Sequence, residues 1–229
     1  MSDYLFPPPE VTALSIRGES ALFPVRRIFC VGRNYAEHAR EMGHDPDREP
    51  PFFFSKPRDA LAFGRAEIPF PPQTADLHYE GELVIALGAG GADVPAAQAL
   101  DLVAGYAIGN DLTRRDLQAV AKKAGRPWDL AKGFDFSAVI SDIVPVAVTG
   151  REPAGRITSR VNGEVRQDSE LSAMIWPVAD VIAFLSQSVT LAAGDLIFTG
   201  TPAGVGKLEK GDVVEVEIDG LGTLSTKIV

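Results

Sequence analysis

The sequence predicts a single α+β domain that is predominantly β, with a few peripheral helices. Short apolar runs separated by glycine or proline recur along the chain and favour strands. An Asn162-Gly163 pair between two such runs is typical of a hairpin turn. The hydrophobic content of 45% is enough to form a large core. We expect residues 26–229 to form the main domain and residues 1–25 to form an extension with a short hairpin.

In the N-terminal part, strand signals surround one short helix. The expected elements are a hairpin of 11–16 and 21–25, a strand at 27–31, a helix at 34–43, a loop at 44–51 and an extended segment at 52–57. Asn34 is expected to cap the helix and Gly43 to end it. The helix is polar on most sides, so we expect it to be peripheral.

The rest of the chain alternates two longer helical patterns with further strands. The expected elements are strands at 83–87 and 102–110, a helix at 114–124, a hairpin at 159–166, a helix at 177–187, and strands at 195–199, 213–218 and 224–228. Pro177 is suited to the first turn of its helix.

Composition narrows the range of partners. The net charge of −9 argues against a nucleic-acid or anionic-membrane partner, since both bind clustered basic side chains. No apolar stretch approaches the roughly 20 residues of a membrane span, and the N-terminus has no secretory pattern. The single cysteine, Cys30, fits a reducing compartment and lies where a small buried hydrophobe is expected. A cytoplasmic location is therefore expected.

Three carboxylates stand at the ends of apolar runs and suggest a metal site. Glu80 and Glu82 precede the strand at 83–87, and Asp111 follows the strand at 102–110. Side chains two apart on a strand share a face. Three converging acids in an apolar framework would repel one another unless a cation lay between them. Oxygen ligands favour Mg²⁺, with Mn²⁺ or Ca²⁺ as alternatives.

Other polar residues have a functional and a structural interpretation. His38 and Glu41 share a helix face, which by itself is typical of a solvated surface. Lys132 lies among aromatic residues, and if it is buried it needs Asp129 or the metal carboxylates as counter-charge. Arg115 has two equally supported interpretations: it binds a substrate carboxylate, or it forms an exposed ion pair with Asp111 or Asp116.

Taken together, these segments resemble the fumarylacetoacetate hydrolase superfamily, whose members cleave or rearrange oxo-acids at a divalent metal. The matching segments are 30–35 with His38 and Glu41, 54–57, 78–83, 111–118, 127–135, 161–164 and 194–206. They span nearly everything from Arg26 onward. Within the superfamily the chain is most similar to bacterial fumarylpyruvate hydrolases and acylpyruvate hydrolases, through 41–51 and 113–118.

The resemblance implies a mixed β-roll or sandwich, a homodimer and a small oxo-acid substrate. It implies metal-dependent hydrolysis of a carbon–carbon bond in a 3-acylpyruvate, foremost fumarylpyruvate to fumarate and pyruvate. The alternative is an oxaloacetate decarboxylase, or an oxo-acid isomerase or hydratase, that uses the same metal pocket. A weaker alternative is a non-catalytic, metal-stabilised binding protein.

The resemblance also implies residue roles. His38 would take a proton from the attacking water, Glu41 would orient His38, and Lys132 would stabilise the developing negative charge. Substrate contacts are expected from Arg115, Gln118, Thr201, Lys56 and Tyr35. The helix at 34–43 and the loop at 44–51 are expected to close over the substrate. The chain departs from the family pattern at Tyr79, where a second histidine is usual, and at Gly81, where a larger residue is usual.

Overall fold

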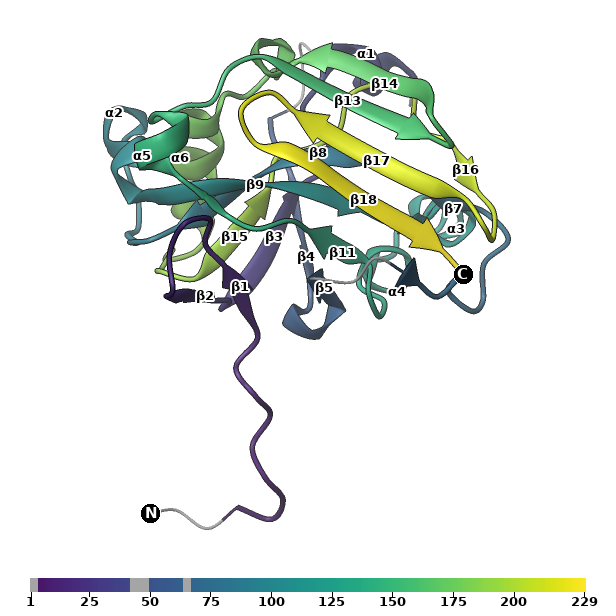
Figure 1. The fold of residues 1–229 in the computed structure, drawn as a ribbon, viewed down its shortest axis with the longest axis horizontal. Helices are drawn as coiled ribbons and strands as arrows, with labels where there is room; N and C mark the ends of the chain where they lie inside the picture. The colour runs from purple at the N-terminus through teal and green to yellow at the C-terminus, as the bar shows by residue number, and fades with distance from the viewer. Residues whose placement is uncertain (1–3, 42–49, 64–66) are drawn as a thin grey trace.

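The computed structural model describes residues 4–41, 50–63 and 67–229, with residues 39–41 described as backbone only. A mixed sheet forms the centre of the molecule, with strand order β4-β3-β15-β8-β9-β11-β5 and β12 also paired with β9 (Figure 1). Its strands are β3 Arg27–Val31, β4 Phe53–Lys56, β5 Leu61–Phe63, β8 Gly81–Leu87, β9 Val103–Asp111, β11 Ala138–Ile140, β12 Val144–Pro145 and β15 Asp195–Phe198. β8 is buried along its whole length, which explains the continuous apolar run that follows Glu82 in this strand.

A second sheet, in the order β14-β13-β17-β18-β6, packs across β8 and β9 (Figure 1). Its strands are β6 Glu67–Ile68, β13 Arg156–Val161, β14 Glu164–Glu170, β17 Val213–Ile218 and β18 Gly222–Ile228. Val214 and Val216 of β17 point into one core cluster with Leu83 and Ile85 of β8. The alternating burial of β17 is that of a sheet with one face on the core.

Helices gather at the two ends of this sandwich (Figure 1). At one end lie α2 Ala96–Ala99, α5 Val146–Thr149 and α6 Val178–Ser188. At the other lie α3 Arg115–Lys123, α4 Asp129–Lys132 and a small sheet of β10 Thr113–Arg114, β7 Leu77–His78 and β16 Lys207–Leu208. The remaining elements are α1 Ala36–Glu41 and 3-10 turns at Arg58–Ala60, Leu100–Leu102 and Leu171–Ala173. Within the described ranges, no helix is long and apolar enough to cross a membrane.

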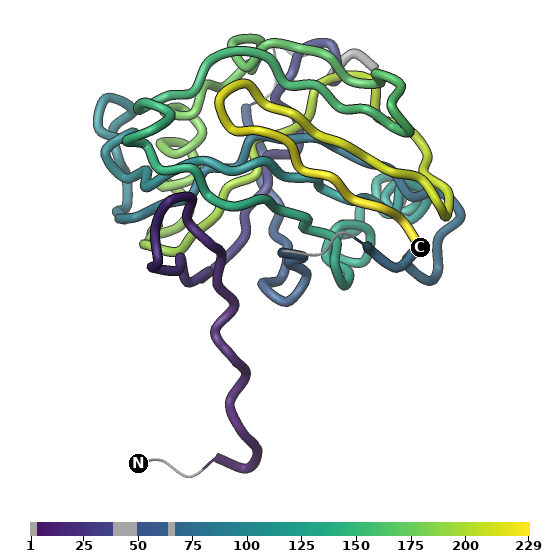
Figure 2. Tube along the Cα trace, viewed as in Figure 1, coloured from purple at the N-terminus to yellow at the C-terminus, as the bar shows by residue number. Residues whose placement is uncertain are grey.

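The N-terminal segment has an anchored part and a projecting part. β1 Ala13–Ser15 pairs antiparallel with β2 Leu22–Pro24. Leu14 and Phe23 of this hairpin are buried in a cluster with Ile28 of β3 and Val84 of β8. The residues before β1 run away from the body, as the tube in Figure 2 shows.

Most expected elements are confirmed, including the predominance of strands, the strand at 27–31 and both longer helices. Asn162 and Gly163 both have positive φ (52° and 82°), as the predicted hairpin turn requires. The predicted cap was wrong, because the Asn34 side chain accepts from Trp176 N at 2.7 Å and donates to Thr199 O at 2.9 Å. Pro177 lies at the N-cap, just before α6.

Candidate metal centre and active site

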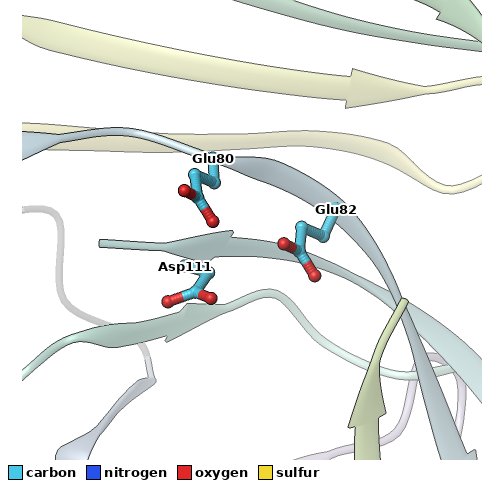
Figure 3. A group of neighbouring side chains, drawn as sticks. All are labelled: Glu80, Glu82 and Asp111. Carbon is cyan, nitrogen blue, oxygen red and sulfur yellow. The ribbon is translucent and has the colours of Figure 1, made fainter. Parts of the chain in front are cut away.

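The three predicted metal ligands meet at one end of the β8–β9 pair. Ligand atoms of Glu80, Glu82 and Asp111 all lie within 4.8 Å of one another. Figure 3 shows the carboxylates converging from neighbouring strands. Their exposed fractions are 5%, 1% and 1%, so water screens their charges very little.

Backbone hydrogen bonds at the end of the ladder hold the ligands in place. The antiparallel register places Gly81 opposite Asn110 and Glu82 opposite Gly109. Asp111 N donates to Glu80 O at 2.9 Å, and Glu80 N donates to the Asn110 side chain at 3.0 Å. Gly200 N donates to Glu82 Oε2 at 2.8 Å. Asn110 is therefore a supporting residue that the sequence analysis did not identify.

Basic side chains surround the carboxylates. Lys132 Nζ donates to Glu80 Oε2 and to Asp111 Oδ2, both at 2.7 Å. Lys56 Nζ lies 2.7 Å from Asp111 Oδ1, and Arg115 Nη2 lies 2.5 Å from Glu80 Oε1. The counter-charge of Lys132 is thus supplied by the expected metal carboxylates.

Burial and the neighbouring charges shift the pKa values of Glu80 and Glu82 in opposite directions. Burial would raise the pKa of Glu80, but the charges of Lys132, Arg115 and His38 lower it overall. Burial, followed by the charges of Asp111 and Glu80, raises the pKa of Glu82 well above its usual range. Burial opposes the charge of Lys132, but Asp111 and Glu80 raise its pKa. Without a metal, Glu82 therefore holds its proton more tightly than Glu80 does.

The cluster fits a hard divalent cation. Its donor atoms are carboxylate oxygens, which Mg²⁺, Mn²⁺ and Ca²⁺ prefer. Burial and the charges of Asp111 and Glu80 raise the pKa of Glu82, and a divalent positive charge at this point would oppose that rise. Glu80, Glu82 and Asp111 are thus the residues that would hold the ion.

Arg115 links the cluster to a polar network on its outer side. Arg115 Nη1 donates to Gln118 Oε1 at 2.7 Å, and Arg115 Nε lies 3.4 Å from His78 Nδ1. His78 Nε2 lies 3.0 Å from Asp76 Oδ1. The alternative of an ion pair with Asp111 or Asp116 was wrong, because Arg115 pairs with Glu80. Burial and the Arg115 charge lower the pKa of His78, which favours the neutral ring.

His38 and Tyr35 lie inside the protein. The sequence pattern alone is typical of a solvated helix face for His38. In the structure, His38 on α1 is only 4% exposed, so it does not lie on such a face. The charge of His38 acts on Glu80. The buried Tyr35 hydroxyl has no hydrogen-bond partner among the described residues. The side chain of Glu41 and most of the expected lid at 44–51 lie outside the described residues.

Gln167 of β14 joins the metal strand to the turn after β15. Its side-chain oxygen accepts from Gly81 N at 3.0 Å, and its nitrogen donates to Thr201 Oγ1 at 2.7 Å and to Pro202 O at 2.8 Å. Thr201 Oγ1 in turn donates to Gly81 O at 2.9 Å. In this arrangement the hydroxyl proton of Thr201 is already donated to Gly81 O. The contact of Thr201 with the substrate stays a prediction. The expected hairpin ended at Arg166, so Gln167 was missed.

The hydrogen bonds that join Gln167 to Gly81, Thr201 and Pro202 are called the Gln167 clamp below. The two departures from the family pattern, Tyr79 and Gly81, are compatible with this clamp. A Cβ on Gly81 would lie 2.3 Å from Ser159 Oγ and 3.3 Å from Gln167 Oε1, so the space of a side chain is already filled. Tyr79 OH donates to Gly204 O at 2.8 Å and so holds the same turn. Tyr79 and Gly81 therefore position the loop that provides Gly200 N to Glu82.

The fumarylacetoacetate (FAA) hydrolase C-terminal family matches residues 27–229. This chain belongs to the fumarylacetoacetate hydrolase family. The fumarylpyruvate hydrolase of Pseudomonas aeruginosa, solved with Mn²⁺ and pyruvate, is 50% identical, with a TM-score of 0.97 over 99% of both chains. The predicted mixed β-roll or sandwich of the fumarylacetoacetate hydrolase family is thereby confirmed.

Other relatives in the fumarylacetoacetate hydrolase family are named oxaloacetate tautomerases rather than hydrolases. The mitochondrial oxaloacetate tautomerase FAHD1 of Mus musculus is 42% identical over 203 residues, which is 89% of this chain and 91% of that protein. The oxaloacetate tautomerase YcgM of Escherichia coli K12 is 40% identical over 208 residues, 90% of this chain and 94% of that protein. The family therefore includes both hydrolysis and tautomerisation of oxo-acids.

Proposed function

We propose that this protein is a metal-dependent hydrolase that cleaves fumarylpyruvate, a 3-acylpyruvate, into fumarate and pyruvate. The observation that carries the proposal is the buried carboxylate triad with Lys132 bridging Glu80 and Asp111. Similarity across 99% of the chain to a fumarylpyruvate hydrolase solved with Mn²⁺ and pyruvate supports it. The expectations of a cytoplasmic location and a homodimer stay predictions.

The reaction adds water to the ketone carbon of the acyl group itself and breaks the bond from that carbon to the methylene carbon of the pyruvate unit, so the acyl group leaves as fumarate and the bonding electrons stay on the pyruvate enolate. Mg²⁺ or Mn²⁺ bound by Glu80, Glu82 and Asp111 would supply Lewis-acid stabilisation of the enolate charge on the departing pyruvate unit. We assign His38 as the group that takes a proton from the attacking water, because a histidine is an effective base near neutral pH. The enolate carbon then takes up a proton to give pyruvate.

The cations around the triad suit an anionic substrate. Lys132 Nζ is buried beside the metal ligands, where a fixed positive charge stabilises a developing oxyanion strongly. Arg115 offers a planar fork for a carboxylate, and Gln118 holds that fork through its 2.7 Å bond. Lys56 and the Tyr35 hydroxyl, which has no hydrogen-bond partner in the part of the chain that the structure describes, complete the proposed substrate contacts.

A second candidate is tautomerisation or decarboxylation of oxaloacetate at the same centre. The oxaloacetate tautomerases of mouse and E. coli, at 42% and 40% identity, favour it. Both reactions proceed through an enolate beside the metal, but neither needs attack of water on a ketone. The same triad and Lys132 therefore fit this chemistry, and the role of His38 separates the two candidates.

A substrate panel tests the proposal. Purified protein is assayed with fumarylpyruvate, maleylpyruvate, acetylpyruvate and oxaloacetate, with Mn²⁺ and with chelator, by following the loss of enol absorbance. We expect the highest kcat/KM for fumarylpyruvate and no turnover with chelator. If oxaloacetate gives the highest value, the second candidate replaces the first.

A His38→Ala variant separates the mechanisms within one protein. Loss of a general base typically reduces turnover by about 10²–10⁴-fold, so fumarylpyruvate hydrolysis should fall by that factor. Metal binding, measured by calorimetry with Mn²⁺, should remain because His38 is outside the triad. Full hydrolysis by the variant would show that His38 is not the base.

A further inference from the structure

One face of α3 continues the cationic side of the metal centre away from the carboxylates. Arg115, Gln118 and Lys122 follow one another at spacings of three and four residues, so they lie on one face of the helix. The 2.7 Å hydrogen bond from Arg115 to Gln118 agrees with that arrangement. Arg115 contacts the metal ligand Glu80, and Lys122 lies two turns further along α3, about 10 Å along the axis. The face that begins at the metal centre therefore ends in a second cation.

Arg33 brings a further positive charge to Lys122 from a distant part of the chain. Arg33 follows β3, whereas Lys122 is near the end of α3. Burial, followed by the charges of Arg33 and Arg115, lowers the pKa of Lys122. Both neighbouring charges that act on Lys122 within the described ranges are thus positive. In a chain with a net charge of −9, such a local excess of positive charge favours an anionic ligand.

A wall of aromatic rings connects Arg33 with the lysine at the metal ligands. The Arg33 guanidinium lies 4.8 Å from the centroid of the Phe52 ring, and Lys132 Nζ lies 5.0 Å from the centroid of the Phe54 ring. Trp128 packs against both rings, with centroid distances of 5.4 Å to Phe52 and 5.8 Å to Phe54. The three rings line a cavity of about 520 Å³. An apolar wall between two cations suits a carbon chain with an anionic group at each end.

We propose that Arg33 and Lys122 form the subsite for the carboxylate at the far end of the acyl group, which makes the enzyme selective for acylpyruvates that carry a second carboxylate. The inference rests on the proposed function and concerns the end of the substrate that the metal centre does not hold. The carbon chain of fumarylpyruvate has as many bonds as two extended residues, which span about 7 Å. With its pyruvate end at Arg115 and the metal ligands, its other carboxylate comes within reach of the long Arg33 and Lys122 side chains.

Two substrates that differ in this carboxylate test the subsite. The values of kcat/KM for fumarylpyruvate and for acetylpyruvate, which lacks the second carboxylate, are measured for the wild type, Lys122→Met and Arg33→Met. We expect the wild type to prefer fumarylpyruvate. Each variant should lower the ratio of the two values by about tenfold or more, the effect of one hydrogen bond to a charged group. The loss should lie mainly in KM for fumarylpyruvate, because the contact is the same in the ground state and the transition state.

Two further variants separate a contact with the substrate from other effects. Lys123→Met removes the next lysine of α3, which is exposed, and should keep the wild-type ratio. Arg33→Lys retains the positive charge and should keep more of the preference than Arg33→Met does. Equal losses in Arg33→Lys and Arg33→Met would mean that Arg33 acts by packing on Phe52, and would overturn its place in the subsite.

Binding of the product gives a readout that does not depend on turnover. Calorimetry of the Mn²⁺-loaded protein compares fumarate with crotonate, which has the same number of carbons but one carboxylate. We expect the wild type to bind fumarate more tightly, and Lys122→Met to lose that advantage. Equal binding of fumarate by the wild type and Lys122→Met, or an unchanged ratio of kcat/KM, would overturn the subsite and leave the proposed function standing. A wild type that cleaves neither acylpyruvate would overturn the proposed function and the subsite together.

Discussion

Lys132 contacts two of the carboxylates that would bind the metal ion. It therefore affects both the stability of the metal-free protein and its affinity for metal, in opposite directions. Its ammonium group holds Glu80 Oε2 and Asp111 Oδ2 at 2.7 Å each and is nearly excluded from water. Without metal it offsets the repulsion between these two acids. With metal it competes for the same oxygens and adds a repelling charge nearby. Lys132 should therefore stabilise the metal-free protein and weaken metal binding.

A Lys132→Met variant should separate these effects. We expect turnover to fall by about 10²-fold or more, since an electrostatic stabiliser of the transition state is lost. The metal-free protein should lose up to about 3–5 kcal/mol of stability, the typical cost of breaking a buried ion pair. Mn²⁺ affinity should rise about tenfold as the competing cation disappears. Denaturant titration, calorimetry and steady-state kinetics measure the three quantities.

The control for Lys132→Met is Lys123→Met, which removes an exposed lysine at the end of α3. It should leave all three quantities unchanged. If Lys132→Met lowered Mn²⁺ affinity together with turnover, Lys132 would instead act by shaping the carboxylate cluster.

Glu82 is the ligand whose protonation should couple metal binding to pH. Its pKa is raised by burial and by the neighbouring charges of Asp111 and Glu80. At a pH where an ordinary glutamate is ionised, Glu82 therefore keeps its proton, and a metal must displace that proton to bind. Metal affinity should consequently fall as the pH decreases below the raised pKa.

Calorimetric titration of Mn²⁺ in two buffers of different ionisation enthalpy should reveal release of up to about one proton per ion at a pH between the usual pKa of a glutamate and the raised pKa of Glu82. The apparent affinity should increase by up to about tenfold per pH unit until the pKa of Glu82 is passed. A Glu82→Gln variant should bind weakly and without this slope. Binding to the wild type without proton release would show that Glu82 is already ionised.

At the scale of elements, the strand β14 and the turn after β15 support the metal strand from outside. Gln167 contacts Gly81 on one side and Thr201 and Pro202 on the other, and it is fully buried. Because Gly81 lies between Glu80 and Glu82, a shift in this clamp displaces metal ligands directly. Gln167 therefore acts as a positioning residue.

Replacing Gln167 by Leu should leave buried polar groups of Gly81 and Pro202 without their partner. We expect a loss of about 1–3 kcal/mol in stability, the usual cost of an unsatisfied buried group. KM and metal affinity should both change, because the clamp holds the turn and the ligand strand together. The neighbouring Arg166→Ala, which removes only an exposed ion pair with Glu164, is the control. Unchanged Mn²⁺ affinity in Gln167→Leu would limit Gln167 to a structural role.

At the scale of the whole molecule, the metal centre gathers three buried carboxylates and the basic groups of Lys56, Lys132 and Arg115 at one end of the β8–β9 pair. The three ligands are buried, and burial, followed by the charges of Asp111 and Glu80, raises the pKa of Glu82. An ion that binds only the folded chain would therefore stabilise the entire two-sheet structure by mass action.

Mn²⁺ should raise the unfolding temperature of the wild type in proportion to the logarithm of its concentration. At a free concentration of 100 times the dissociation constant, the added stability is about 2.7 kcal/mol. Differential scanning fluorimetry with Mn²⁺, Mg²⁺ and Ca²⁺ measures the shift, and Glu82→Gln should lose most of it. An equal shift in wild type and variant would place the stabilising ion elsewhere.

Local patterns in the sequence determined several features without tertiary information. The strand at 27–31, the helix at 114–124 and the Asn162-Gly163 turn were predicted from residue type and periodicity over a few neighbours. The candidate metal ligands followed from the same kind of signal, because Glu80 and Glu82 are two apart at the start of a strand and Asp111 ends the next one. The candidate metal ligands could therefore be predicted from short segments of the sequence.

Only the tertiary structure decided which charges and hydrogen-bonding groups meet. Arg115 reaches Glu80 rather than Asp111 or Asp116, and Gln167 reaches Gly81 across 86 residues of sequence. These pairings depend on sheet register and on packing between the sheets, which no local pattern encodes. The sequence by itself specified the acids and their spacing; the fold selected their partners, because burial forces each charged or polar group to find one nearby.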